Sequence, residues 1–252
     1  MDSSSTKDNF IILYKLIMKN LAVIPARGGS KRIPNKNIRL FNEKPIIQYS
    51  IEAAYNSGLF EEVMVSTDDQ KIAQIAIELG AKVPFYRSAA AAGDHATLAE
   101  VIIDVMDSYQ AKGLSFDYFC CILATAPFVT VEKLKEGYKK LIDEKFDSVV
   151  PFVHYPVPIQ QALKINPENN KVEMFFDDQY GIRTQDFVPS YYDAGMFYWM
   201  KPESVKSKRR ISCDNTGAVI LSELETHDID TENDWKIAEQ KYYYIHNVVN
   251  KK

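Results

Sequence analysis

The sequence is poor in cysteine and contains no long hydrophobic run. Only three cysteines occur in 252 residues, and two of them, Cys120 and Cys121, are adjacent; the third is Cys213. An odd number without regular spacing excludes a disulfide framework and is typical of a reducing compartment, so we interpret all three as small buried side chains. The apolar stretch from Phe10 to Met18 is interrupted by Lys15 and is far shorter than the roughly 20 residues that a membrane span requires. We therefore expect a cytoplasmic protein with no membrane partner.

A general excess of positive charge is also missing. Thirty Lys and Arg residues face 34 Asp and Glu residues, which gives a net charge of −4. A nucleic-acid-binding protein should carry a broad basic surface, so we expect no nucleic-acid partner. The hydrophobic fraction of 46% and the charged fraction of 25% are ordinary for a globular chain, and the length suits one α/β domain with a sizeable core.

The first 17 residues stand apart from this domain. A strand-like pattern begins just after Met18, and Asp2 and Asp8 do not suit the basic start of a secretory leader. We hypothesise that Met18 is the natural start, that residues 1–17 are a non-native or dispensable extension, and that residues 18–252 form a single domain.

Strand-like and helix-like segments alternate along most of the chain. Apolar strand patterns cover residues 21–25, 63–66, 81–87, 117–127, 148–153, 194–200 and 217–224, with a further short piece at 226–230. Helical patterns follow Pro45 and Asp69, start at Thr97, cover 131–144 and run from about 232 to 243, where Thr231 and Asp234 resemble a capping box. Such alternation predicts an α/β fold built from βαβ units with a mostly parallel sheet.

The alternation fails between residues 154 and 192. This segment is rich in Pro, Asn, Gln and aromatic residues, and "PENNK" predicts a hairpin turn between two extended pieces. We interpret residues 154–192 as an excursion from the sheet.

A basic loop directly follows the first predicted strand. It carries four cations, Arg27, Lys31, Arg32 and Lys36, together with Gly28 and Gly29, which allow backbone N–H groups to approach an anion. Neither a Walker A motif nor a G-x-G-x-x-G fingerprint is present. By composition the loop is equally a solvated basic turn, but ligands of parallel α/β sheets bind beyond the carboxyl ends of strands, which favours phosphate binding.

Asp228 and Asp230 form the second candidate feature. In an extended segment, residues i and i+2 point to the same face, and two carboxylates on one face repel each other unless a cation lies between them. Mg²⁺ is commonly held by one or two carboxylates together with substrate phosphates. The alternative is that Asp230 helps to cap the last helix and that Asp228 is solvated; the phosphate loop elsewhere in the chain favours the metal site. The four histidines show no ligand spacing.

Several stretches together resemble the acylneuraminate cytidylyltransferase family. These are "IPARGGSKRIPNKN", "KPIIQYSIEAA", "VSTDD" and "DIDTENDW", and the resemblance covers about residues 20–243. It implies a Rossmann-like α/β domain with helices on both faces of the sheet, a small dimerisation excursion at residues 154–192, a homodimer, Mg²⁺ as cofactor and CTP as co-substrate. It also implies attack of the anomeric hydroxyl of a nonulosonic acid on the α-phosphate of CTP, with pyrophosphate leaving.

The resemblance assigns roles to residues of this sequence. It implies Arg27, Lys36 and Asp230 as catalytic residues and Asp228 and Asp230 as metal ligands. The implied nucleotide-binding set is Ala26, Arg27, Gly28, Gly29, Ser30, Lys36, Asn37, Arg87 and Thr97. We assign the sugar to Ala124, Thr125, Arg183, Gln185 and Asp193, and we propose Arg183 as the cation that the sugar carboxylate needs.

Two departures lie on the sugar side of the implied site. Sialic acid enzymes typically read "QPTSP" and "RPNGA" where this chain has "ATAPF", with Ala124 in place of glutamine, and "YDAGM". "ATAPF", "RTQDF" and "DAGMFYW" resemble the branch that activates pseudaminic acid. We therefore expect a pseudaminic acid substrate; the alternatives are a sialic acid cytidylyltransferase and a CTP-binding regulatory module without catalysis.

Overall fold

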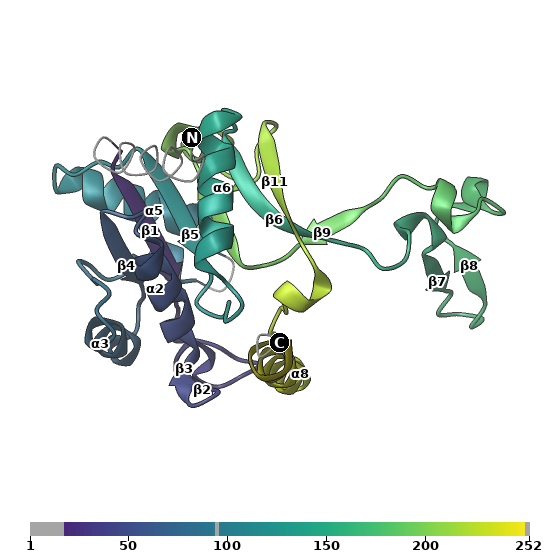
Figure 1. The fold of residues 1–252 in the computed structure, drawn as a ribbon, viewed down its shortest axis with the longest axis horizontal. Coiled ribbons are helices and arrows are strands. Elements are labelled where there is room, and N and C mark those ends of the chain that lie inside the picture. The colour runs from purple at the N-terminus through teal and green to yellow at the C-terminus, as the bar shows by residue number, and fades with distance from the viewer. Residues whose placement is uncertain (1–17, 94–95, 250–252) are drawn as a thin grey trace, which may run out of the picture.

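The centre of the molecule is a seven-stranded sheet (Figure 1). The computed structural model describes residues 18–93 and 96–249, so the hypothesis about residues 1–17 lies outside the described residues. The strands are β1 (Asn20–Pro25), β4 (Glu62–Ser66), β5 (Tyr118–Ile122), β6 (Ser148–His154), β9 (Tyr191–Asp193), β10 (Phe197–Met200) and β11 (Thr216–Leu221). Their order is β11-β6-β10-β5-β1-β4, with β9 paired to β6.

The sheet is parallel at its core and mixed overall. Strand β1 runs parallel to β4 and β5, and β6 runs parallel to β11, as the βαβ pattern predicts. Strand β10 is antiparallel to both β5 and β6, and β9 is antiparallel to β6. The excursion explains this reversal: it leaves β6 after His154 and returns beside it at Tyr191, so the next strands must run back along β6.

Helices cover both faces of the sheet, as expected. Alternate strand residues divide between two buried clusters: Ala22 and Ile24 belong to one, Leu21 and Val23 to the other. The first cluster packs against α2 (Ile46–Ser57), α3 (Gln70–Glu78), α6 (Val131–Asp143) and α8 (Glu232–Tyr244). The second packs against α5 (Leu98–Ala111) and α7 (Pro202–Lys208).

Most helix starts coincide with the predicted caps. The Asp69 side chain accepts from Ile72 N at the start of α3. Thr97 and Thr231 each form a complete capping box, with Glu100 and Asp234 respectively. Pro45 belongs to a two-residue strand, β3 (Lys44–Pro45), paired with β2 (Leu40–Phe41), so α2 begins one residue later than predicted.

Three predicted strands need correction. Residues 81–87 make a single bridge between Met64 and Lys82, because Pro84 cannot donate to a ladder. Strand β5 ends at Ile122 rather than near residue 127, since Ala126 N and Val129 N donate within turns. No strand forms at residues 226–230, where carbonyl groups accept from side chains instead: Lys241 Nζ donates to Thr226 O and Lys36 Nζ to Ile229 O.

The excursion projects away from the sheet (Figure 1). Its hairpin of β7 (Leu163–Ile165) and β8 (Val172–Met174) confirms the predicted turn at "PENNK", where Asn170 adopts a φ of 57°. The excursion carries many exposed apolar side chains, including Ile165, Val172, Phe175 and Tyr180. These side chains are not covered by the chain's own core.

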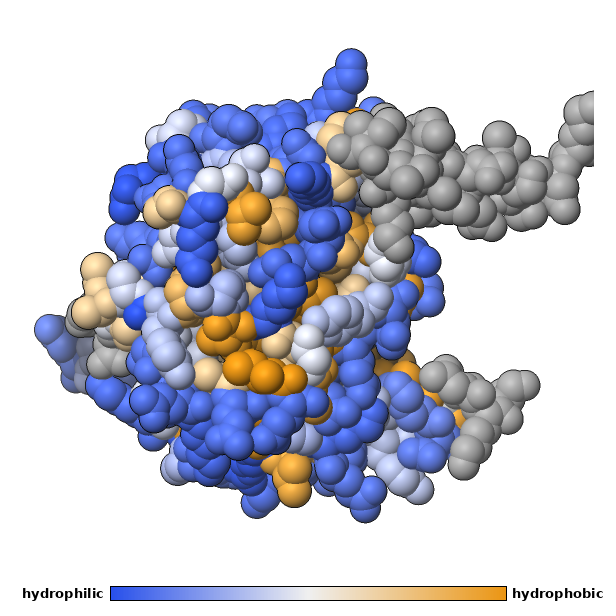
Figure 2. All heavy atoms as spheres, turned by 90° about the vertical axis from the view of Figure 1, so that its left-hand side faces the viewer, coloured by the Kyte–Doolittle hydropathy of each residue, from blue (hydrophilic) through white to orange (hydrophobic). Residues whose placement is uncertain are grey.

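The face of the molecule opposite the excursion is mostly polar. Figure 2 shows mostly hydrophilic residues on the side of the molecule opposite the excursion, with apolar residues gathered in a limited central area. No helix in the described part of the chain is both long and apolar enough to cross a membrane.

Cys120 and Cys121 are buried in β5 as predicted, whereas Cys213 is only partly buried in the loop after α7.

Candidate active site

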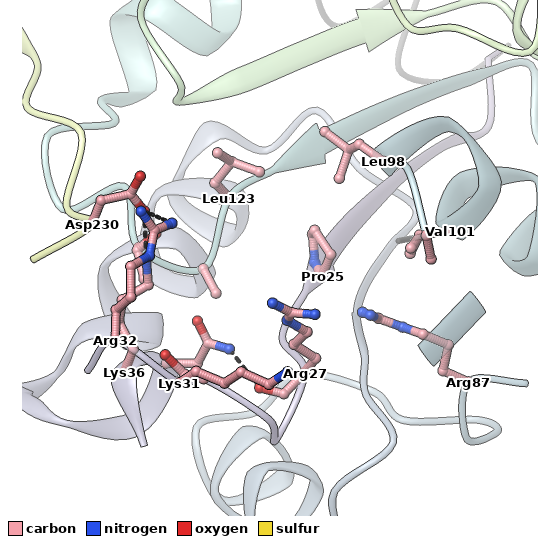
Figure 3. A pocket seen from close by; sticks show the side chains of 15 residues that line it. Pro25, Arg27, Lys31, Arg32, Lys36, Arg87, Leu98, Val101, Leu123 and Asp230 are labelled. Carbon is pink, nitrogen blue, oxygen red and sulfur yellow. Dashed lines mark hydrogen bonds and ion pairs between the residues drawn. The ribbon is translucent and has the colours of Figure 1, made fainter. Parts of the chain in front are cut away.

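A cavity of about 630 Å³ opens at the carboxyl ends of β1 and β5 (Figure 3). Its wall combines the basic loop, the loop after β5, the start of α5 and the segment before α8. The lining residues are Pro25, Arg27, Ser30, Lys31, Arg32, Lys36, Asn37, Arg87, Ala96, Leu98, Val101, Leu123, Ala124, Thr125 and Asp230. The cavity therefore lies where ligands bind in α/β sheets.

The start of the basic loop is held by the loop after β4. Ala26 is buried, and its N–H donates to Ser66 O at 2.9 Å. Gly28 N donates to Asp68 Oδ1 at 3.0 Å, and a Cβ atom at Gly28 would lie 2.6 Å from Asp69 Oδ2. Only glycine fits this close approach, whereas a Cβ atom at Gly29 would meet nothing within 4 Å.

The end of the basic loop is fixed by Lys36 and Asn37. Asn35 adopts a left-handed conformation with a φ of 54°, which turns the chain into the short helix Lys36–Ile38. Asn37 Nδ2 donates to Arg27 O at 2.9 Å and so ties the end of the loop to its start. Lys36 Nζ donates to Ile229 O at 2.5 Å and lies 3.5 Å from Asp230 Oδ1. Lys36 thus links the basic loop to the acid pair.

Arg87 supplies a second guanidinium beside Arg27. It is buried, its Nε donates to Ser66 Oγ at 3.1 Å and its Nη2 donates to Ser66 O at 2.5 Å. Figure 3 shows the two guanidinium groups of Arg27 and Arg87 extending toward each other across the cavity. Burial lowers the pKa of Arg87, which nearby Asp68 partly offsets; arginine stays charged even so. An anion in this part of the cavity would relieve the repulsion between the two arginines.

Asp228 and Asp230 lie close enough to interact electrostatically. Although the Asp228 side chain is exposed, partial loss of its hydration raises its pKa, the Asp230 charge raises it further, and Lys36 partly offsets both. Asp230 Oδ1 lies 2.8 Å from Arg32 Nη2. The Asp230 carboxylate does not cap α8, because Thr231 is the capping residue of that helix. The structure therefore brings the acid pair to the basic loop without a strand at 226–230.

The acid pair fits a divalent cation that is shared with phosphates. The donors are hard carboxylate oxygens, and their mutual repulsion leaves negative charge for a cation to neutralise. No group of three or more His, Cys, Asp or Glu side chains able to hold a metal occurs among residues 18–93 and 96–249. Two carboxylates with substrate phosphates match how proteins usually bind Mg²⁺.

Of the five residues expected at the sugar, two line the cavity and three, including Asp193, do not. Ala124 and Thr125 line the cavity. Asp193 Oδ1 accepts from Gly195 N at 2.8 Å and from Tyr198 OH at 3.1 Å, and Gly195 packs beside Asp228. Arg183 and Gln185 lie on the excursion, where Arg183 pairs with Asp186 at 2.8 Å, and neither lines the cavity of its own chain.

The expected nucleotide-binding set differs from the residues that line the cavity. The Thr97 hydroxyl is used in the capping box, and its neighbours Ala96 and Leu98 line the cavity instead. Sequence reasoning left Lys31 and Arg32 without a role and missed the apolar wall, which consists of Pro25, Leu98, Val101 and Leu123. The only signal for Arg32 was its membership of the basic loop.

Comparison with known proteins identifies the family of the chain. The family model described as "Cytidylyltransferase" matches residues 21–216. A pseudaminic acid cytidylyltransferase of Campylobacter jejuni is 40% identical over 229 residues, which are 91% of this chain and 98% of the relative. A CMP-N,N'-diacetyllegionaminic acid synthase of Legionella pneumophila is 33% identical over 88% of this chain and 96% of the relative.

A solved structure supports the fold. CMP:2-keto-3-deoxy-manno-octonic acid synthetase, solved in complex with CTP, superposes with a TM-score of 0.66 at 17% identity, covering 88% of this chain and 97% of that one. The family model spans most of the chain, and the similarity to the Campylobacter protein extends over nearly the whole length of both. The chain therefore belongs to the cytidylyltransferase family.

Proposed function

We propose that the protein activates a nonulosonic acid with CTP, giving the CMP-sugar and pyrophosphate. The observation that carries the proposal is the cavity lined by Arg27, Lys36, Arg87 and Asp230, with Asp228 two residues before Asp230 and outside the lining. Several cations beside a pair of neighbouring carboxylates suit a metal-bound triphosphate.

In the proposed reaction the anomeric hydroxyl of the sugar attacks the α-phosphate of CTP, and the bond to pyrophosphate breaks. Phosphoryl-type transfer depends mainly on positioning and on stabilisation of charge. Arg27 and Lys36 stabilise the triphosphate and the departing pyrophosphate. Asp228 and Asp230 would hold Mg²⁺, which when bound neutralises phosphate charge.

The remaining nucleotide contacts come from the basic loop and its neighbours. We assign Ala26, Gly28, Gly29 and Ser30 to backbone contacts with CTP; Asn37, Arg87 and Thr97 complete the set. Ser30, Asn37 and Arg87 line the cavity. The hydroxyl of Thr97 is already committed to Glu100, so a contact from this position falls to its backbone or to its neighbours.

We propose pseudaminic acid as the sugar. The "ATAPF" stretch and the named activity of the Campylobacter relative support this choice, and Ala124 leaves more room than the glutamine typical of sialic acid enzymes. Thr125 and Asp193 are the proposed polar contacts. Since Arg183 and Gln185 lie on the projecting excursion, their contact with the sugar requires the excursion of a second copy, and we propose a homodimer.

The test is pyrophosphate release from CTP and Mg²⁺ with pseudaminic acid, N-acetylneuraminic acid or N,N'-diacetyllegionaminic acid. We expect the highest kcat/KM with pseudaminic acid. A preference for N-acetylneuraminic acid would contradict our interpretation of Ala124. CTP binding without pyrophosphate release for any sugar would identify a regulatory module instead.

A further inference from the structure

Arg32 forms an ion pair with Asp230, a proposed metal ligand. Arg32 Nη2 and Asp230 Oδ1 are 2.8 Å apart, and Figure 3 shows the guanidinium lying against the carboxylate at the rim of the cavity. The two residues are 198 positions apart in the chain, so the pair joins the basic loop to the segment before α8. A carboxylate held in this way is partly neutralised by the protein itself.

The two cations on Asp230 differ in how firmly they are held. The Lys36 side chain is only 19% exposed, and its Nζ is also fixed by the Ile229 carbonyl. The Arg32 side chain is 66% exposed, and its pairing partner Asp230 is 40% exposed. Arg32 is therefore the partner that can leave without disturbing the fold.

A second carboxylate, that of Asp68, accepts a hydrogen bond from the backbone of the basic loop. Gly28 N–H, which belongs to the glycine pair that suits an anion, donates to Asp68 Oδ1 at 3.0 Å. Both Asp68 and Asp230 thus accept from groups that could otherwise bind phosphate oxygens. A triphosphate carries more negative charge than one carboxylate and accepts from arginine in a bidentate way, so it competes well for Arg32.

We propose that Arg32 is a positioning residue that holds Asp230 in the nucleotide-free protein and moves to the triphosphate when CTP binds. The release of Asp230 would make the acid pair bind a divalent cation more tightly after the nucleotide has arrived than before. This inference rests on the proposed function, because it takes CTP as the anion and the acid pair as the metal site.

The first test measures Mn²⁺ binding without nucleotide, from the electron paramagnetic resonance signal of free Mn²⁺. Wild type is compared with Arg32→Gln and with Arg39→Gln as matched control. Arg39 pairs with Glu232 at 2.6 Å in the same region but does not line the cavity. Arg32→Gln should bind Mn²⁺ about two- to fivefold more tightly, the effect expected from losing one exposed ion pair, and the control should match wild type. At saturating CTP the three proteins should bind Mn²⁺ equally.

The second test is a double-mutant cycle on CTP affinity in the presence of EDTA. Asp230→Asn should tighten CTP binding because it frees Arg32, and this gain should shrink in the Arg32→Gln background. Asp228→Asn removes the same charge from the neighbouring position and serves as control, with a gain that does not depend on Arg32. The cycle also covers the case in which Arg32→Gln alone loses stability, since circular dichroism identifies that variant and Arg32→Met, which keeps an apolar stem without the charge, replaces it in the cycle.

The outcomes separate the inference from the proposed function. Equal Mn²⁺ affinity of wild type and Arg32→Gln without nucleotide, or additive effects of Arg32→Gln and Asp230→Asn, would overturn the role of Arg32 while CTP binding and turnover remain. Failure of wild type to bind CTP with Mg²⁺ would overturn both.

Discussion

At the scale of single residues, the site is built from groups whose charges oppose stability. Arg27 and Arg87 extend toward each other, and the charge of Asp230 acts on the neighbouring carboxylate of Asp228. Like charges placed together cost stability in the empty protein and are useful only when a charged ligand is present. Individual substitutions should therefore separate stability from activity.

Asp228→Asn should make the protein more stable and less active. Partial loss of hydration and the charge of Asp230 raise the pKa of Asp228, so the folded state binds its proton more tightly than the unfolded chain does, and stability falls as pH rises through the raised pKa. The thermal midpoint of Asp228→Asn in EDTA should match wild type well below about pH 4 and exceed it by about 2 °C near pH 7.

The activity of the same variant is the companion measurement. Loss of one proposed metal ligand should lower kcat/KM with Mg²⁺ by at least about 100-fold. A variant with wild-type turnover would contradict the metal assignment. Identical thermal midpoints of the variant and wild type at all pH values would contradict the unfavourable ionisation of Asp228 in the folded protein.

Gly28→Ala and Gly29→Ala form a matched pair for the basic loop. A Cβ atom at position 28 would lie 2.6 Å from Asp69 Oδ2, on the residue that caps α3, whereas position 29 is open. Urea denaturation should show a loss of about 1–3 kcal/mol for Gly28→Ala and less than about 0.5 kcal/mol for Gly29→Ala. Equal midpoints for both variants would show that the loop can move away from Asp69.

At the scale of elements, the helices start at side chains that act locally. The capping box of α5 joins Thr97 and Glu100 through bonds at 2.8 Å and 3.2 Å. Because a cap needs only a few neighbouring residues, the starts of α3, α5 and α8 could be predicted from the sequence. The loop after β1 and the acid pair could be predicted for a similar reason, since each is a compact motif of one charge sign.

The Thr97 cap gives a direct test of its structural role. Thr97→Ala should cost about 1 kcal/mol of unfolding free energy, and Thr97→Ser should restore most of it because serine keeps the accepting oxygen. Urea midpoints measure both. If CTP affinity falls in Thr97→Ala while stability is unchanged, the hydroxyl serves the nucleotide rather than the helix.

Features that depend on distant pairing could not be predicted. The antiparallel direction of β10 follows from where the excursion returns to β6, which no local pattern encodes. The segment 226–230 has the alternation of a strand, yet Lys36 and Lys241 take its carbonyl oxygens. Helix α7 did have a local signal, Pro202 at its first turn, which the sequence analysis overlooked.

At the scale of the whole molecule, the excursion is joined to the sheet by a narrow neck. Tyr155 N donates to Ser190 O at 2.9 Å, directly after the pairing of His154 with Tyr191. The two ends of the excursion are thus adjacent, and the apolar side chains beyond them are exposed within one chain. Several exposed apolar side chains gathered on one projecting segment are typical of a protein–protein interface.

Removal of the excursion should leave a folded monomer. Joining Tyr155 to Ser190 through two glycines deletes residues 156–189 without stretching the neck. Light scattering after gel filtration should give a dimer for wild type and a monomer for the deletion, with a cooperative thermal transition in both. CTP binding should persist in the deletion, and pyrophosphate release should be lost. A monomeric wild type would contradict the proposed homodimer.

The bond between Arg32 and Asp230 also has a consequence for synthesis. The ribosome adds about 5–20 residues per second, so the 198 positions between these residues take about 10–40 s to make. For most of that interval the basic loop has already left the ribosome, whereas the acidic segment that pairs with it has not yet been made. During translation Arg32 therefore lacks its Asp230 partner, so its guanidinium can pair with other anions.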